Sequence, residues 1–183
     1  MVVDLNWLKQ NLQLQMLSEN ELSALKCVEV LQYQVGDIIL EQGEVGGGLF
    51  ILYSGFISIL SHRQDETVVL ARDVSGALFA KHCLLDAQST SNVEVAADDA
   101  CIVYKLSHEN FIRLMREHHK LAYAILFHML NYQSDMIQKK EDQLFPFLLA
   151  LKRKAEKLPL PVKLIPVIFI VAYTTAFFFK LLS

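Results

Sequence analysis

The residues that could do chemistry lie together in one short stretch of the chain. Leu78–Ala97 reads LFAKHCLLDAQSTSNVEVAA, in which Lys81, His82 and Cys83 are consecutive and hydroxyl and amide side chains follow. A lysine, a histidine and a thiol can each serve as a nucleophile, a base or a ligand for an anion. No local motif joins them to the further groups that a nucleophile and its base require. The stretch therefore indicates a binding loop, and we expect no catalytic residues and no enzyme activity.

The other histidines and the cysteines predict neither a metal site nor a cofactor. His118 and His119 are adjacent, so they point to different faces of a helix and cannot chelate one metal ion together. His128 lies within an apolar helical pattern, where a packed or hydrogen-bonded ring is the interpretation we favour. Three cysteines lie in apolar contexts without metal-ligand spacing and are predicted to be buried thiols in a reducing compartment: Cys27, Cys83 and Cys101.

Composition and charge indicate one globular body with a basic, apolar appendage. The chain has 183 residues, of which 53% are hydrophobic, and its mean hydropathy of +0.31 is high for a soluble protein. There are nine basic and 17 acidic residues up to Gln138, but eight basic and three acidic residues from Lys139 onward. The N-terminus lacks the basic and apolar regions of a secretory signal, so we expect the body on the cytoplasmic side.

Hydrophobic periodicity predicts helices, a β-rich middle and further helices. Two short helices open the chain, the second over Glu21–Leu31, and Ser18 with Glu21 matches a capping box. From Tyr33 to Leu106, short β-rich runs alternate with glycine and acidic residues. Strands of this length and spacing predict a mainly β fold, a β-roll or jelly roll with flanking helices. Ser107 then caps a helix, and a longer helix follows.

Four segments are predicted. They are N-terminal helices over residues 1–32, the roll and its following helices over 33–143, a basic amphipathic linker over 144–163, and a transmembrane tail over 164–183. Pro146 is expected to interrupt the helix. In the linker, apolar residues on one face and basic residues on the other are typical of a helix in a membrane interface. The basic residues predicted to meet the membrane interface are Lys152, Arg153, Lys154, Lys157 and Lys163.

The final segment has the length and composition of a short membrane-spanning helix. Leu164–Phe179 contains no charged residue, and about 20 residues of helix, roughly 30 Å, match the hydrocarbon core of a bilayer. A buried core helix or a strand is the alternative, because the uncharged run is near the lower length limit for spanning. Lys180 can snorkel to the far interface, and the upstream basic cluster agrees with the positive-inside rule. We therefore predict a single-pass protein with a C-terminal anchor.

The region Ile39–Gly55, ILEQGEVGGGLFILYSG, resembles the first signature of the cyclic nucleotide-binding domain. This β-roll is shared by relatives of catabolite activator protein, regulatory subunits of cAMP-dependent kinase and cyclic-nucleotide-gated channels. Gly43, Gly46, the apolar run Leu49–Leu52 and Gly55 all fall in register with the family pattern. The element order agrees from the second helix through the long helix. The resemblance implies the same roll; an unrelated jelly roll with similar turns is the alternative.

This resemblance places the opening stretch on the family's phosphate-binding cassette. There a glycine lets the backbone approach the ligand, a glutamate accepts a hydrogen bond from the ribose hydroxyl, and an arginine pairs with the cyclic phosphate. Those positions here hold Ala80, Lys81 and Ser91. Removing one partner of a buried charge pair costs about 3 to 5 kcal/mol, so the resemblance implies that cyclic nucleotide binding in the usual mode is lost. The altered pocket consists of Ala80, Lys81, His82, Cys83, Ser91 and Asn92.

Two functions agree with these patterns. The first is a tail-anchored adaptor or accessory subunit of a membrane protein complex; the second is a membrane-tethered sensor in which Lys81 or His82 meets a different small anion. Nucleic acid is not an expected partner, because a proline-broken basic linker follows the long helix where DNA-binding relatives carry a helix-turn-helix. One apolar stripe on the long helix forms either a dimer or partner seam or a contact with the roll: Leu121, Ile125, Met129, Tyr132 and Met136.

Overall fold

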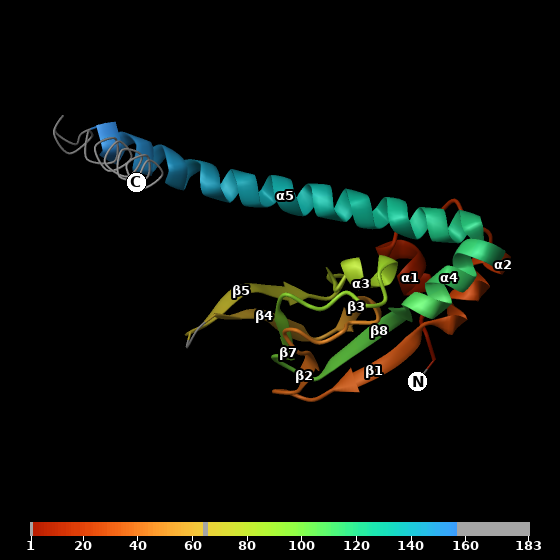
Figure 1. The fold of residues 1–183 in the computed structure, drawn as a ribbon. Coiled ribbons are helices and arrows are strands. Elements are labelled where there is room, and N and C mark those ends of the chain that lie inside the picture. The colour runs from red at the N-terminus through yellow and green to blue at the C-terminus, as the bar shows by residue number, and fades with distance from the viewer. Residues whose placement is uncertain (1, 64–65, 157–183) are drawn as a thin grey trace, which may run out of the picture. The chain divides into compact units, whose positions relative to one another are not determined.

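The computed structural model describes residues 2–63 and 66–156. These divide into two compact units, residues 1–132 and residues 133–183, which are treated separately. The first unit contains short N-terminal helices, two β-sheets and the helices that follow them (Figure 1). Most of the candidate binding residues therefore lie in the first unit.

Two short helices and a 3-10 turn open the chain. The Asp4 carboxylate accepts a hydrogen bond from the Trp7 N–H at the start of the first helix, and the Ser18–Glu21 capping box is confirmed at the second. The predicted helix over Glu21–Leu31 is wrong beyond Cys27, because the chain then becomes a strand that pairs with a distant one. This pairing overrides the local helical pattern. The elements are α1 (Leu5–Asn11), α2 (Glu19–Leu22), η1 (Ser23–Cys27) and β1 (Glu29–Tyr33).

The strands form a jelly roll of two antiparallel sheets, as predicted (Figure 1). One sheet has the order β1-β8-β3-β6 and the other has the order β2-β7-β4-β5. Strands that follow one another in the sequence are thus often placed in different sheets. The remaining strands are β2 (Ile38–Leu40), β3 (Gly48–Ser54), β4 (Phe56–Arg63), β5 (Glu66–Val74), β6 (Leu78–Phe79), β7 (Glu94–Ala97) and β8 (Cys101–Ser107).

Two apolar clusters pack against opposite faces of the sheet that contains β3. Because side chains alternate along a strand, Phe50 and Leu52 face the other sheet, whereas Leu49 and Ile51 face the helices. All four side chains are buried, and each cluster also takes residues from β8. The sheet is therefore covered on both sides, which fixes the register of its strands.

Two helices follow the roll, α4 (His108–Glu117) and α5 (His119–Glu156). Ser107 caps α4 as predicted, because its hydroxyl accepts a hydrogen bond from the Asn110 N–H at 3.2 Å. The predicted interruption at Pro146 is wrong, since α5 passes through it. A proline removes one intrahelical hydrogen bond, and the turns on either side of Pro146 remain helical.

The apolar stripe proposed as a dimer seam packs mainly on the roll. Leu121, Ile125 and Met129 are buried in the cluster between the helices and the sheet, and Tyr132 is half-buried against that cluster. Met136 lies in the second unit and is half-buried. Of the two interpretations of this stripe, the structure supports packing within the chain for the residues up to Tyr132.

The predicted tail anchor lies outside the described residues, together with Lys157 and Lys163. No helix within residues 2–63 and 66–156 has the length and apolar character needed to span a bilayer. Residues 144–156 of the predicted linker belong to α5, where Lys152 and Arg153 are exposed and Lys154 is helical.

Gly48 begins β3 at a point where the neighbouring strand leaves no room for a side chain. A Cβ there would overlap the Leu106 carbonyl oxygen and lie 2.8 Å from the Ser107 Cα. Paired backbone cannot move aside, so we expect Gly48→Ala to lower the free energy of unfolding by about 3 kcal/mol. Urea unfolding of the full chain in detergent, followed by the fluorescence of its single tryptophan, Trp7, measures this loss.

Gly43→Ala is the matched control for Gly48→Ala. No atom lies within 4 Å of a Cβ at Gly43, whose φ is +88°. Gly43→Ala should lower the free energy of unfolding only by the cost of an L side chain in the left-handed region, about 1 to 2 kcal/mol. Equal losses in the two variants would contradict the packing at Gly48.

Candidate ligand-binding cassette

The cassette connects β6 to β7 through a tight turn, a single helical turn and a loop. Ala80 follows β6 with φ +51°, in the left-handed region that glycine adopts at little cost. This is the position at which the sequence resemblance expects a glycine. The turn is thus left-handed here with an alanine side chain on it. The helical turn is α3 (His82–Leu85).

Backbone hydrogen bonds join the end of the cassette to the loop between β2 and β3. The Gly43 N–H donates to the Ser91 carbonyl at 2.7 Å, and the Ser91 N–H donates to the Glu44 carbonyl at 2.8 Å. Gly46 lies beneath α3, where a Cβ would be 2.6 Å from the Cys83 Sγ. The glycines of the sequence signature therefore hold the cassette against the roll.

The ammonium group of Lys81 is engaged within the protein. Its Nζ donates to the Leu78 carbonyl at 2.7 Å and lies 5.0 Å from the centroid of the Tyr132 ring on α5. An ammonium group over an aromatic face is attracted by the ring quadrupole. Burial raises the pKa of Tyr132, so its ring stays uncharged at neutral pH. This placement favours a packed lysine over an anion ligand at position 81.

Ser91, which the sequence resemblance places at the family's arginine position, is satisfied locally. It is buried, and its hydroxyl donates to the Val93 carbonyl at 2.6 Å. The Val93 N–H donates in turn to the Ser91 hydroxyl oxygen at 3.4 Å. A serine hydroxyl offers one donor and no charge, so it cannot form the forked pair that an arginine makes with a phosphate.

The other predicted pocket residues turn to separate partners. The Nε2 of His82 lies 3.1 Å from the Thr90 carbonyl, and the Cys83 thiol donates to the Ser89 carbonyl at 3.3 Å. Burial raises the pKa of the Cys83 thiol, which keeps it protonated and unreactive. Asn92 is exposed. The side chains of Lys81, His82 and Cys83 thus do not converge on one reaction centre.

The thiols and histidines show no metal-binding arrangement. Within residues 2–63 and 66–156 there is no group of three metal-ligating side chains, and the three cysteines are free. Cys83 and Cys101 are buried as predicted, whereas Cys27 is only half-buried. Because η1 ends at Cys27, its side chain lies at an element boundary and not inside the predicted longer helix.

A polar hollow of about 540 Å³ lies beside the end of the cassette. Among the described residues that line it, Arg63 on β4 alone carries a positive charge. Glu66 stands directly opposite Arg63 in the β4–β5 ladder, so an acidic side chain neighbours this cation. No motif in the sequence marks Arg63 as a site residue. The lining consists of Gln42, Gly43, Ser61, Arg63, Thr90, Ser91 and Asn92.

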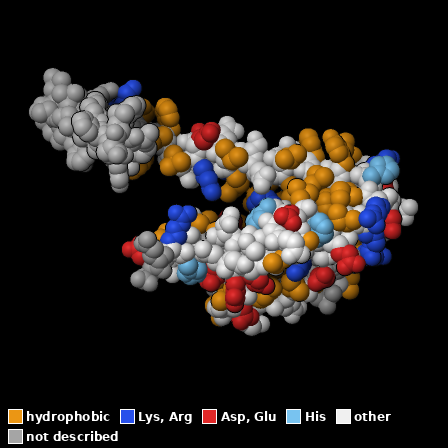
Figure 2. Space-filling model, viewed as in Figure 1, with side chains coloured by type: hydrophobic (Ala, Val, Ile, Leu, Met, Phe, Trp, Pro, Cys, Tyr) orange, Lys and Arg blue, Asp and Glu red, His pale blue; other side chains and the backbone are white. Residues whose placement is uncertain are grey.

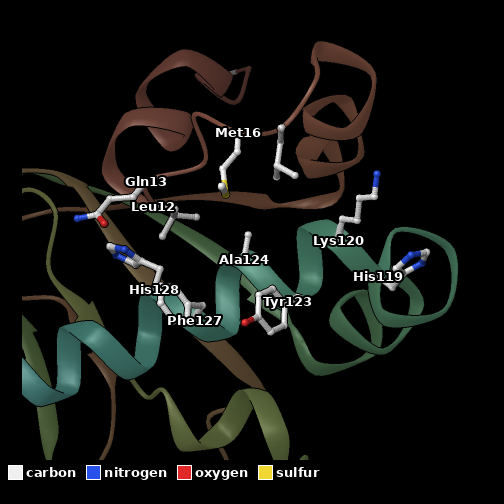
Figure 3. A pocket seen from close by; sticks show the side chains of 10 residues that line it. Leu12, Gln13, Met16, His119, Lys120, Tyr123, Ala124, Phe127 and His128 are labelled. Carbon is white, nitrogen blue, oxygen red and sulfur yellow. The ribbon is translucent and has the colours of Figure 1, made fainter.

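A second hollow, of about 700 Å³, lies between the α1–α2 segment and the first part of α5 (Figure 3). Leu12, Met16 and Phe127 contribute apolar side chains to it, and His128 lies near Gln13 at one end. His128 is buried, as expected for a packed ring, and its Nδ1 has no hydrogen-bond partner among the described residues. Burial lowers the pKa of His128, so the ring is neutral at neutral pH.

Residues 30–118 match the family model of the cyclic nucleotide-binding domain. This part of the chain is a cyclic nucleotide-binding-like domain. Many solved structures share its fold. The cyclic nucleotide-binding domain from Methylobacillus flagellatus KT has a TM-score of 0.65 and 17% identity, covering 71% of this chain and 74% of that one. The catabolite activator protein of Thermus thermophilus has a TM-score of 0.60 and 24% identity, covering 73% and 62%.

Curated relatives include two human ion channels. The potassium/sodium hyperpolarization-activated cyclic nucleotide-gated channel 4 of Homo sapiens is 30% identical over 86 residues, which are 47% of this chain and 7% of the channel. The potassium/sodium hyperpolarization-activated cyclic nucleotide-gated channel 3 of Homo sapiens is 29% identical over 85 residues, which are 46% of this chain and 10% of the channel. The chain therefore spans a tenth or less of the length of these relatives, and the similarity is confined to the domain.

The left-handed turn at Ala80 gives a direct stability test. Because glycine populates this conformation without a Cβ clash, we expect Ala80→Gly to raise the free energy of unfolding by about 1 kcal/mol. Ala87→Gly is the matched control in the same cassette, since Ala87 has no positive φ; it should lower stability by about 0.5 to 1 kcal/mol. Urea unfolding measures both variants, and a loss of stability in Ala80→Gly would contradict the strained turn.

Proposed function

We propose that this protein is a non-catalytic, membrane-attached adaptor or accessory subunit whose cyclic nucleotide-binding-like domain does not hold a cyclic nucleotide in the usual mode. The observation that carries this proposal is the engagement of two substituted positions inside the protein. Lys81 is bonded to the Leu78 carbonyl and Ser91 to the Val93 carbonyl. Lys81 offers no acceptor for a ribose hydroxyl, and Ser91 offers no charged fork for a phosphate.

The second unit supports attachment to a membrane. The α5 segment Leu144–Leu151 exposes six large apolar side chains, and two exposed basic residues, Lys152 and Arg153, follow directly (Figure 2). Apolar and basic side chains arranged in this way are typical of helices that lie in a lipid interface. The apolar sequence of residues 164–183 supports an anchor beyond it. The exposed apolar residues are Leu144, Phe145, Phe147, Leu148, Leu149 and Leu151.

A membrane protein complex is the proposed partner. The curated relatives carry a domain of this kind within proteins named as ion channels, which supports a role beside an integral membrane protein. An anchored chain would present the roll to such a neighbour at high effective concentration. The domain would then act through its outer surface, with the cassette as part of the scaffold.

Titration calorimetry of the full chain in detergent micelles tests the loss of nucleotide binding. We expect no heat from cAMP or cGMP up to about 1 mM, which corresponds to a binding free energy weaker than roughly −4 kcal/mol. The triple variant Ala80→Gly, Lys81→Glu, Ser91→Arg restores the three family groups and should bind at least about tenfold more tightly than the natural chain. Micromolar binding by the natural chain, removed by Lys81→Ala, would instead support a sensor.

Extraction from membranes tests attachment and partnership. Expressed in cells, the full chain should remain in the membrane pellet after an alkaline carbonate wash, whereas a chain that ends at Gln143 should be released. Gentle detergent extraction should recover an integral membrane protein together with the chain. Release of the full chain by carbonate would contradict the anchor, and purification of this chain without another membrane protein under every condition would contradict the accessory-subunit role.

A further inference from the structure

The hollow between the α1–α2 segment and α5 has the size and lining of a small-molecule site (Figure 3). Its volume of about 700 Å³ falls within the range of about 300 to 1,000 Å³ that is usual for ligand pockets. Buried Leu12 and Leu17 line it together with Met16 and Phe127, which are 90% and 54% exposed. Large apolar side chains around a hollow mark a binding site. All the lining residues belong to the first unit.

The loop after α1 is fixed by the way that helix ends. The Gln13 N–H donates to the Gln10 carbonyl at 3.2 Å, and the Leu14 N–H donates to the Lys9 carbonyl at 2.8 Å. This is a Schellman ending, whose left-handed position usually holds glycine. Gln13 occupies that position with a φ of +55°. An amide side chain thus stands where glycine would be favoured, and it lies near His128 at one end of the hollow (Figure 3).

His128, at the same end of the hollow, is a buried polar side chain that lacks a partner. It is 8% exposed, and its Nδ1 makes no hydrogen bond among the described residues. A buried polar atom without a hydrogen bond costs free energy, which a ligand that supplies the bond would recover. Burial lowers the pKa of His128 and keeps the ring neutral. A hydroxyl group both donates and accepts, so it suits a neutral imidazole in either tautomer.

The fixed charges around the hollow are balanced. Within residues 2–63 and 66–156, Lys120 is the one lysine or arginine of the lining, and the lining contains no acidic residue. The Lys120 Nζ lies 3.8 Å from the Glu21 carboxylate, which offsets its charge. An ionised ligand would therefore bring its charge into an apolar hollow without a partner of its own, which is unfavourable. The hollow suits an uncharged ligand.

We propose that this hollow binds an uncharged, apolar molecule that carries one hydroxyl group, with the hydroxyl at the end formed by Gln13 and His128. The eight residues from Lys120 to His128 advance about 12 Å along α5. An extended chain of about ten carbon atoms, with bonds of about 1.5 Å, has a similar length. Between these ends the rings of Tyr123 and Phe127 are stacked, with centroids 6.2 Å apart, and offer the chain an apolar wall. The proposal goes beyond the adaptor function, since it requires neither the cassette nor a membrane anchor.

Nuclear magnetic resonance of labelled methionine methyl groups, with the full chain in lipid nanodiscs, measures the binding of decanol. Met16 lines the hollow, whereas Met115, on α4 and 38% exposed, does not. We expect a saturable shift of the Met16 signal and no shift of the Met115 signal. Undecane matches decanol in size but has no hydroxyl, and decanoate and decyltrimethylammonium carry a charge instead. Each of these three should bind at least about tenfold more weakly than decanol at equal mole fraction in the lipid.

His128→Phe removes the imidazole from its end of the hollow. The preference for decanol over undecane should fall from at least about tenfold to about twofold or less, because no ring nitrogen remains to bond the hydroxyl. Both ligands are measured on the same sample, so a fraction of unfolded protein cannot produce this loss. His119→Phe is the matched control at the other end of the hollow and should keep the preference. An unchanged preference in His128→Phe would overturn the proposal.

Ala124→Phe tests the hollow by filling it. Ala124 is a half-buried lining residue, so the larger side chain should weaken decanol binding at least about tenfold. Ala150→Phe makes the same exchange at an exposed position of α5 outside the lining and should leave binding unchanged. An unshifted Met115 signal shows that each variant keeps its fold. Equal effects of the two variants, or tighter binding of a charged ligand than of decanol, would overturn the proposal. A Met16 signal that changes on dilution without any ligand would assign the hollow to a second copy and would overturn it as well.

Discussion

The site depends on the hydrogen bonds and close packing that join the β2–β3 loop to the cassette. Gly43 and Ser91 are joined through backbone groups, and the missing side chain of Gly46 lets Cys83 sit directly on the loop. These contacts use backbone atoms and a close approach, so they do not depend on which side chains face a ligand. The cassette can therefore keep its shape after the groups that would bind a nucleotide have been replaced.

Ala80 and Lys81 combine a backbone turn that suits the family's glycine with side chains that differ from the family's glycine and glutamate. The turn at Ala80 has a positive φ that suits glycine, although an alanine occupies it. Lys81 has reversed the charge of the family's glutamate and bonds to the Leu78 carbonyl beneath Tyr132. The cassette is thus connected to α5 by an internal contact, and the surface of the molecule becomes the place where partners are sought.

Sequence patterns predicted the roll because its signals are local. Short β-rich runs between glycine and acidic residues indicated the strands, and the Ser18–Glu21 capping box indicated a helix start. The glycine signature gave the alignment that places Ser91 at the family's arginine position. The start of β1 at Glu29 was missed because a distant pairing with β8 decides it. The two faces of α5 were not separable either, since Leu121 and Tyr123 lie in the same largely apolar run and only packing shows which one the roll covers.

We propose that the cassette is closed by its own groups and does not respond to a cyclic nucleotide. Nuclear magnetic resonance of the full chain in micelles, with selective labelling of the amides at Lys81, Cys83 and Ser91, tests this most directly. Saturating cAMP should leave these three resonances in place, because their side chains and backbone are already engaged inside the protein. Progressive, saturable shifts of the same resonances would show that the cassette still binds the nucleotide and would contradict the account.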